Sequence, residues 1–93
     1  GTGYAVSVDK TKAVKGDVIT LTFTSTVAAG ETADTLTVTP TGATAATAGA
    51  TSVTFEANAK AGTVKTLKFV ANGEDISFSV NGSITDDTTP VGP

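Results

Sequence analysis

Several residue types that carry chemistry in proteins are missing from this chain of 93 residues. It contains no Cys and no His, and it also lacks Met, Trp and Arg. Without Cys, neither a disulfide framework nor a thiolate zinc site can form. Without His or Cys, nucleophilic catalysis of the Ser-His-Asp or Cys-His type is excluded.

Positive charge and long apolar runs are also scarce. Six Lys are spread along the chain against nine acidic residues, and the formal net charge is −3. A chain with no basic stripe and no Arg is not expected to bind nucleic acid or an anionic membrane surface. No apolar run approaches the length of a membrane span, so no membrane insertion is expected.

Thr and Ala are abundant instead, and the apolar residues alternate with polar ones. The chain has twenty Thr and fourteen Ala, and Thr is β-branched and favours half-exposed strand surfaces. Period-two alternation predicts six strands. They lie near 4–9, 18–26, 35–39, 52–57, 66–71 and 76–80. Their predicted inward residues are Tyr4, Val6, Val8, Ile19, Leu21, Phe23, Leu36, Val38, Val53, Phe55, Ala57, Leu67, Phe69, Ala71, Ile76, Phe78 and Val80.

The segments between these runs have turn and loop character. Residues 14–17 (VKGD) and 58–62 (NAKAG) are typical of turns, and 28–34 of a polar loop. Asn72-Gly73 stands between two alternating runs and predicts a β-hairpin. Residues 40–51 are rich in small residues and suit a seventh, short edge strand or a loop; their Gly and Thr disfavour an Ala-rich helix.

Seven short strands in a chain of this size favour an all-β sandwich of antiparallel strands, with a barrel as the structural alternative. We expect one domain over residues 1–84. The pattern stops at Val80, and residues 85–93 (TDDTTPVGP) are acidic, Thr-rich and Pro-rich, which predicts a linker or tail. Such a tail suggests that the domain is tethered to a larger parent protein.

Two stretches resemble bacterial immunoglobulin-like (Big) domains. VSVDKTKAVKGDVITLTFTST resembles their start, and AKAGTVKTLKFVANGEDISFSV resembles their end, so the likeness covers about residues 4–82. The chain departs from many such domains at Thr63-Val64, where an aromatic residue often follows the Gly of the turn. The resemblance implies an immunoglobulin-like β-sandwich on a virion or cell surface. It also implies partners such as virion subunits and bacterial cell-surface glycans.

Carboxylate pairs offer the clearest candidates for a site. Glu74-Asp75 follows the predicted turn, where acidic residues are ordinary solvated turn formers. Asp86-Asp87, with the loop at Asp9, are calcium candidates, because carboxylate oxygens are ligands that calcium prefers. Two acidic residues in a Thr/Pro tail more often belong to a simple linker, so we predict neither a metal nor a cofactor.

Two covalent chemistries are formally open but not expected. Five Ser residues lie on predicted strand faces with no evident base; they are Ser7, Ser25, Ser52, Ser77 and Ser79. Some surface immunoglobulin-like domains contain an isopeptide crosslink between side chains. The residues of this chain that could form one are Lys10, Lys12, Glu56 and Asn81. No sequence motif supports either chemistry. The chain is predicted not to be an enzyme.

The outward Thr ladders at 20–26 and 35–39 are the most unusual feature. They are explained either by a plain solvated sheet face or by a polar, low-charge surface for sugars or a protein neighbour. Tyr4 is expected to plug the core or an edge rather than to stack on a sugar.

The predicted function is a non-enzymatic accessory module displayed on a phage capsid or tail. There it would decorate or stabilise the particle, or give weak adhesion to the bacterial surface. The alternative is a repeat of a bacterial cell-surface adhesin, acting as spacer or binder, and a third class is a carbohydrate-binding module of a secreted hydrolase. The isolated domain is expected to be a monomer.

Overall fold

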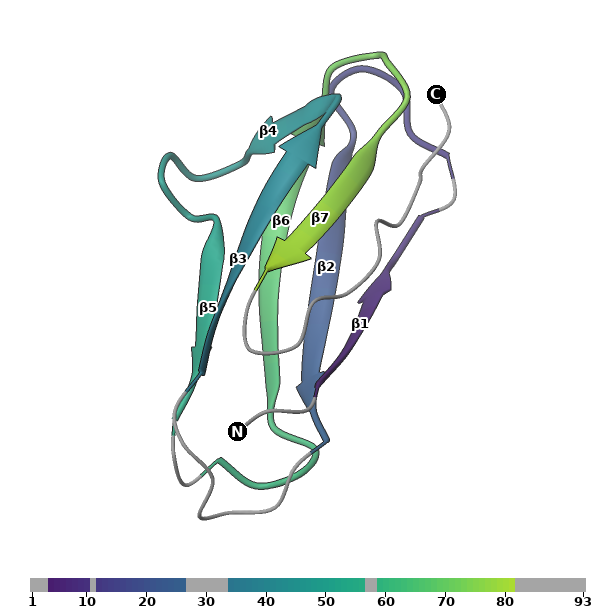
Figure 1. Cartoon of the computed structure of the whole chain (residues 1–93). Coiled ribbons are helices and arrows are strands. Elements are labelled where there is room, and N and C mark those ends of the chain that lie inside the picture. The colour runs from purple at the N-terminus through teal and green to yellow at the C-terminus, as the bar shows by residue number, and fades with distance from the viewer. Residues whose placement is uncertain (1–3, 11, 27–33, 57–58, 82–93) are drawn as a thin grey trace.

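The computed structural model describes residues 4–10, 12–26, 34–56 and 59–81, which form seven strands and no helix (Figure 1). The strands are β1 Tyr4–Val8, β2 Val18–Ser25, β3 Asp34–Thr41, β4 Ala43–Ala45, β5 Ser52–Phe55, β6 Val64–Ala71 and β7 Ser77–Asn81. The predicted all-β fold is confirmed. The predicted tail at 85–93 and the inward position Ala57 lie outside the described residues.

The strands form two antiparallel sheets that face each other as a sandwich (Figure 1). One sheet has the order β1-β2-β6-β4 and the other the order β5-β3-β7. The four-stranded order matches the A-B-E-D sheet of an immunoglobulin-like domain, with β3 and β7 in the places of strands C and F. Strand β5, on the far side of β3 from β7, has no counterpart in that seven-strand scheme.

The core lies between the sheets and is built from the alternating inward residues. The predicted inward positions on β2, β3, β5, β6 and β7, with Ile76, are buried, and those on β1 are half-buried and pack against the core. The rings of Phe69 on β6 and Phe78 on β7 meet across the sandwich, with centroids 5.1 Å apart. Burying each such side chain contributes about 1.5–3 kcal/mol, so these contacts hold the sheets together.

Residues 14–17 form the predicted turn before β2. Gly16 has a φ of 92°, as the third residue of a type II turn requires. The Asp17 N–H donates to the Val14 carbonyl at 2.9 Å, and the Asp17 carboxylate accepts the Val14 N–H at 3.0 Å. The Gly16 N–H also donates to the Ala71 carbonyl at 2.9 Å, which joins this turn to the end of β6.

The prediction of a hairpin at Asn72-Gly73 is wrong. Strands β6 and β7 belong to different sheets, so the segment between them crosses the sandwich. A two-residue Asn-Gly hairpin of type I′ needs positive φ at both central residues. Here Gly73 has a φ of 93°, whereas no non-Gly residue in the described part of the chain has positive φ. Asn72 instead donates its N–H to the Gly42 carbonyl at 2.9 Å.

Residues 40–51, for which a short edge strand or a loop was predicted, contain the end of β3 and the short edge strand β4. The single residue Gly42, with a φ of 77°, separates them and carries the chain from the three-stranded to the four-stranded sheet. A Cβ at Gly42 would overlap the Asp75 carbonyl oxygen. Only glycine therefore fits this close approach.

Pro40 lies inside β3, where its missing N–H breaks no ladder bond. The Val38 N–H donates to the Thr51 carbonyl at 2.8 Å, so Val38 points its backbone toward β5. Backbone groups alternate in direction along a strand, so Pro40 faces the same side as Val38. The register of β5 on β3 ends at Thr37. Pro40 therefore faces a side where β5 no longer runs.

Candidate binding face

The outer surface of the three-stranded sheet carries hydroxyl side chains at every described outward position. We call this surface the hydroxyl face. It comprises Thr35, Thr37, Thr39 and Thr41 on β3, Ser52 and Thr54 on β5, and Ser77 and Ser79 on β7. All are exposed except Ser77, which is half-buried. The face follows directly from alternation, because the residues between these positions point into the core.

Strand register arranges these hydroxyls as a grid. Thr35 lies opposite Thr54 and Thr37 opposite Ser52, while Thr39 and Ser79 are partners on the other side. Neighbours along a strand are about 6.8 Å apart, and adjacent strands are about 4.8 Å apart. The Thr35 and Thr54 hydroxyls are 2.9 Å apart and share a hydrogen bond.

The hydroxyl face is neutral and conformationally restricted. None of its eight side chains is charged, and charged residues occur at the strand ends: Asp34 begins β3, Glu56 follows β5, and Glu74-Asp75 precede β7. Thr is branched at Cβ and keeps few side-chain rotamers. Each hydroxyl can both donate and accept a hydrogen bond. A matching ligand is therefore neutral and rich in hydroxyl or amide groups.

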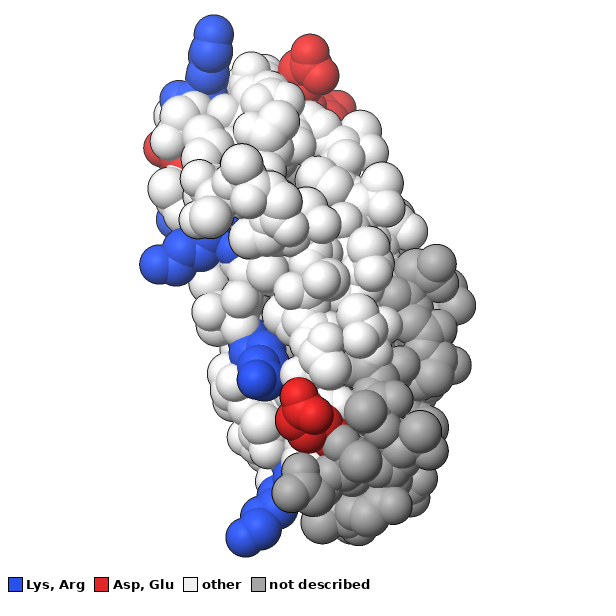
Figure 2. All heavy atoms as spheres, turned by 90° about the vertical axis from the view of Figure 1, so that its left-hand side faces the viewer, with Lys and Arg blue, Asp and Glu red and all other residues white. Residues whose placement is uncertain are grey.

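The second Thr ladder, on β2, lies in a different environment. Thr20, Thr22 and Thr24 point outward from the four-stranded sheet, on a strand that pairs with β1 and β6, but they are half-buried. Thr20 lies opposite Lys68, so this face carries a charge. Figure 2 looks onto the β4 and β5 side, where the Lys side chains lie apart and form no patch. The two ladders are thus not equivalent, and only the hydroxyl face is both exposed and neutral.

The sequence predicted three of the eight residues of the hydroxyl face. The ladder at 35–39 was expected, but Ser52, Thr54, Ser77 and Ser79 were not assigned to the same surface. Each of them alternates with a buried residue, which was a usable signal. Strand pairing was the missing information, because alternation places a residue on a face without showing which strands share that face.

The Asp9 carboxylate has a structural use. Its Oδ1 accepts the Thr20 N–H at 2.9 Å, while the Asp9 N–H donates to the Thr20 carbonyl at 3.2 Å. The hydrogen bond from Thr20 is the main cause that lowers the pKa of Asp9 below its ordinary value. Lys10 adds a smaller effect through an ion pair at 3.3 Å, whereas desolvation acts in the opposite direction. Asp9 therefore fixes the exit of the chain from β1.

The calcium candidates are not brought together in the described part of the chain. Asp86 and Asp87 lie outside the described residues, and Glu74 and Asp75 are exposed. Among the residues that the structure describes, no group of three or more acidic side chains could hold a metal ion. The carboxylate of Asp9 is hydrogen-bonded to the backbone as described above.

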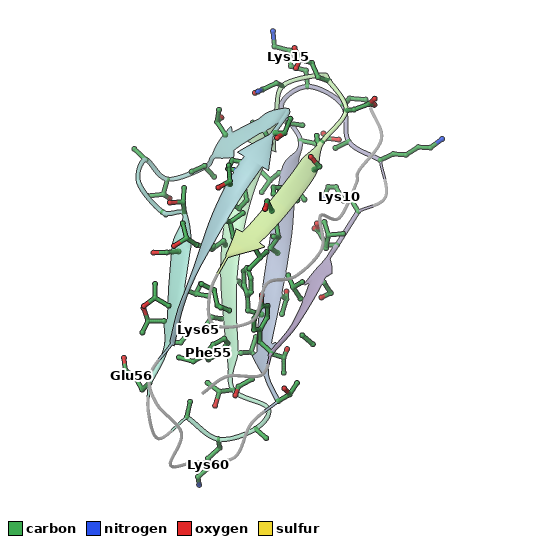
Figure 3. All side chains as sticks on the ribbon, viewed as in Figure 1. Lys10, Lys15, Phe55, Glu56, Lys60 and Lys65 are labelled. Atoms are coloured by element: carbon green, nitrogen blue, oxygen red, sulfur yellow. The ribbon has the colours of Figure 1, made fainter. Side chains whose placement is uncertain are left out.

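The residues considered for covalent chemistry are dispersed. Figure 3 shows Lys10 and Glu56 at opposite ends of the sandwich. Lys12 is exposed, and the Asn81 side chain lies outside the description. Ser7 lies on the four-stranded sheet, and three of the other Ser residues belong to the hydroxyl face.

Ser25 differs from the four other Ser residues that the structure describes because it is buried. It follows Phe23 on the inward side of β2, and its side chain is only 2% exposed. Its Oγ makes no hydrogen bond to any residue that the structure describes. A buried hydroxyl without a partner is destabilising.

Comparison with protein-family models, with curated proteins and with solved structures finds no match. Within the described ranges there is also no helix with the length and hydropathy that a membrane span requires.

Proposed function

We propose that this chain is a non-enzymatic, immunoglobulin-like accessory module displayed on a phage capsid or tail. Its role is to decorate or stabilise the particle, or to give weak adhesion to the bacterial surface. The observation that carries this proposal is the hydroxyl face, a neutral surface without a charged or aromatic side chain. The resemblance of residues 4–82 to Big domains supports the particle-bound setting.

The chemistry of the face favours weak, repeated contacts over one tight contact. A neutral hydrogen bond contributes about 0.5–1.5 kcal/mol net, whereas association costs about 4–15 kcal/mol. Hydrogen bonds from one such face offset little more than this cost. Many copies on one particle remove the limitation, because linked copies bind with a high effective concentration. A displayed module with a neutral glycan as its ligand fits these magnitudes.

Beads coated with the purified chain test the adhesive role. We expect coated beads to bind isolated bacterial cell walls, and the free chain at the same concentration to bind poorly. A Thr37→Val/Thr39→Val double variant removes two hydroxyls without changing charge. It should weaken bead binding about tenfold, which corresponds to about 1.4 kcal/mol for two neutral hydrogen bonds.

The matched control is Thr22→Val/Thr66→Val, because these paired residues face outward on the opposite sheet. Its beads should bind like the parent. If parent beads bind no better than beads coated with an unrelated acidic protein, the adhesive role is wrong. The stabilising role is tested separately by heating particles with and without the module, and it fails if both release their genome at the same temperature.

The coding sequence next to this chain distinguishes the proposed setting from its alternative. A capsid or tail region supports display on a phage. Tandem copies of the same module would instead indicate a repeat of a bacterial surface adhesin.

A further inference from the structure

The connection between β6 and β7 presents an exposed Asn next to an unengaged backbone nitrogen. Asn72 and Gly73 are both exposed. Asn72 donates its own N–H to the Gly42 carbonyl, but within the described residues its side-chain amide makes no hydrogen bond and neither does the Gly73 N–H. Gly73 also has no Cβ to shield its nitrogen. A nucleophile and an amide carbon are thus adjacent and solvated, and neither group is hydrogen-bonded to a described residue.

We propose that Asn72 is a site of spontaneous modification, at which the side chain cyclises onto Gly73 and is converted to a carboxylate. A solvent base removes the Gly73 amide proton, and the nitrogen attacks the Asn72 side-chain carbon. The bond from that carbon to the side-chain nitrogen breaks, and the nitrogen leaves as ammonia, so a five-membered succinimide remains. Water then opens either carbonyl of the ring. One opening leaves aspartate, and the other leaves isoaspartate, with the backbone routed through the side chain.

The structure separates Asn72 from the second Asn-Gly pair of the chain. Asn81 is the last residue of β7, and its backbone pairs with Thr37 of β3. Cyclisation rotates the backbone around the Asn, so Asn81 must first leave the sheet, whereas Asn72 lies in a connection. Local opening has a free-energy cost. Asn72 should therefore react at least about tenfold faster in the folded protein, the ratio that corresponds to an opening free energy of about 1.4 kcal/mol.

The modified residue lies in the connection that carries the chain from one sheet to the other. Asn72 is hydrogen-bonded to Gly42, and Gly42 packs directly against the Asp75 carbonyl. Isoaspartate adds one methylene to the backbone of this short connection. Either product also places a carboxylate beside Glu74 and Asp75. The isoaspartate form should consequently have a lower melting temperature than the parent chain.

The test is an incubation of the full chain at mildly alkaline pH, followed by cleavage after Glu74 and mass spectrometry. This cleavage separates Asn72 from Asn81. We expect the fragment with Asn72 to gain the mass difference between water and ammonia, while the fragment with Asn81 stays largely unchanged. In denaturant both fragments should change at comparable rates. Equal rates at the two sites in the folded protein, or an unmodified Asn72 when the denatured chain reacts, would overturn the proposal.

Two variants distinguish this chemistry from general degradation. Asn72→Gln keeps the amide but would need a larger ring, so ammonia loss from this fragment should stop. Asn72→Asp supplies the carboxylate without lengthening the backbone, so the isoaspartate form should melt below it. If the Gln variant loses ammonia at the parent rate, cyclisation onto Gly73 is not the route. If the isoaspartate form and the Asp variant have the same melting temperature, the longer backbone does not destabilise the connection between the sheets.

Discussion

Two residues, Gly42 and Asp9, show how local geometry determines the path of the chain. Each acts on a segment distant in sequence, because Gly42 packs against Asp75 and Asp9 binds the backbone of Thr20. Neither residue lies in a regular strand. Both are needed where the chain leaves one strand and must reach its next position correctly.

Replacing Gly42 with Ala is expected to destabilise the fold strongly. The new Cβ would overlap the Asp75 carbonyl oxygen, which belongs to the backbone and cannot move away cheaply. We expect a loss of about 3 kcal/mol or more in the free energy of unfolding, measured by urea denaturation. Gly49→Ala is the matched control, because Gly49 has a φ of 79° but open space around it. It should cost only about 1 kcal/mol. Equal costs would show that the contact with Asp75 is unimportant.

The Asp9 hydrogen bond should make stability depend on acid pH. Asp9→Ala should cost about 0.5–1 kcal/mol at neutral pH, a low value for a charged acceptor because the side chain is 43% exposed. The pKa of Asp9 is lower in the folded state than in the unfolded state. Its contribution is therefore complete above the unfolded value and is lost as pH falls through the folded value.

Urea unfolding of parent and Asp9→Ala at a series of pH values tests this. The difference in unfolding free energy should be constant near neutrality and shrink as pH falls below 3.8. A Lys10→Ala variant should keep most of that pH dependence, because the Thr20 N–H is the larger cause of the lowered pKa. A difference that is independent of pH would contradict the assigned role.

At the scale of elements, proline substitutions in β3 test which neighbouring strand each of its backbone N–H groups faces. It pairs with β5 along its first half and with β7 along its second. Pro40→Thr should change stability by less than about 1 kcal/mol, because Pro40 faces the side that β5 does not cover. Thr39→Pro should cost about 3 kcal/mol or more, since the Thr39 N–H points toward β7. Thermal unfolding followed by circular dichroism measures both, and similar costs would disprove the assigned direction of the backbone groups.

Alternation predicted the strands and their inward faces because burial depends on the direction of each side chain, which the strand period determines. Which strands pair with each other was harder to predict from the sequence. The segment around Asn72-Gly73 has the composition of a hairpin but crosses between sheets, and its true constraint is the distant Gly42. The exposed ladder on β3 was predictable, whereas the contributions of β5 and β7 to the hydroxyl face depend on strand order. Contacts between segments far apart in sequence leave no local pattern.

At the scale of the whole molecule, one core joins both sheets, so the described domain should unfold in a single transition. Phe78→Ala should cost about 3–5 kcal/mol by leaving a cavity against Phe69, and Phe78→Leu about 1–1.5 kcal/mol. Tyr4, which packs near Phe23 at 6.4 Å between ring centroids, reports on β1 by fluorescence. Its transition should coincide with that from circular dichroism in every variant. Separate transitions would mean that the sheets unfold independently.

The alternation of consecutive strands between the two sheets affects how fast the protein folds. After β1 and β2, every next strand along the chain enters the sheet opposite to the one before it. No later strand can therefore find its partner by folding back on its neighbour. Loops must close before most contacts form, and sandwiches of this kind fold in about milliseconds to seconds. A newly made chain thus spends a comparatively long time with its β-prone strands exposed.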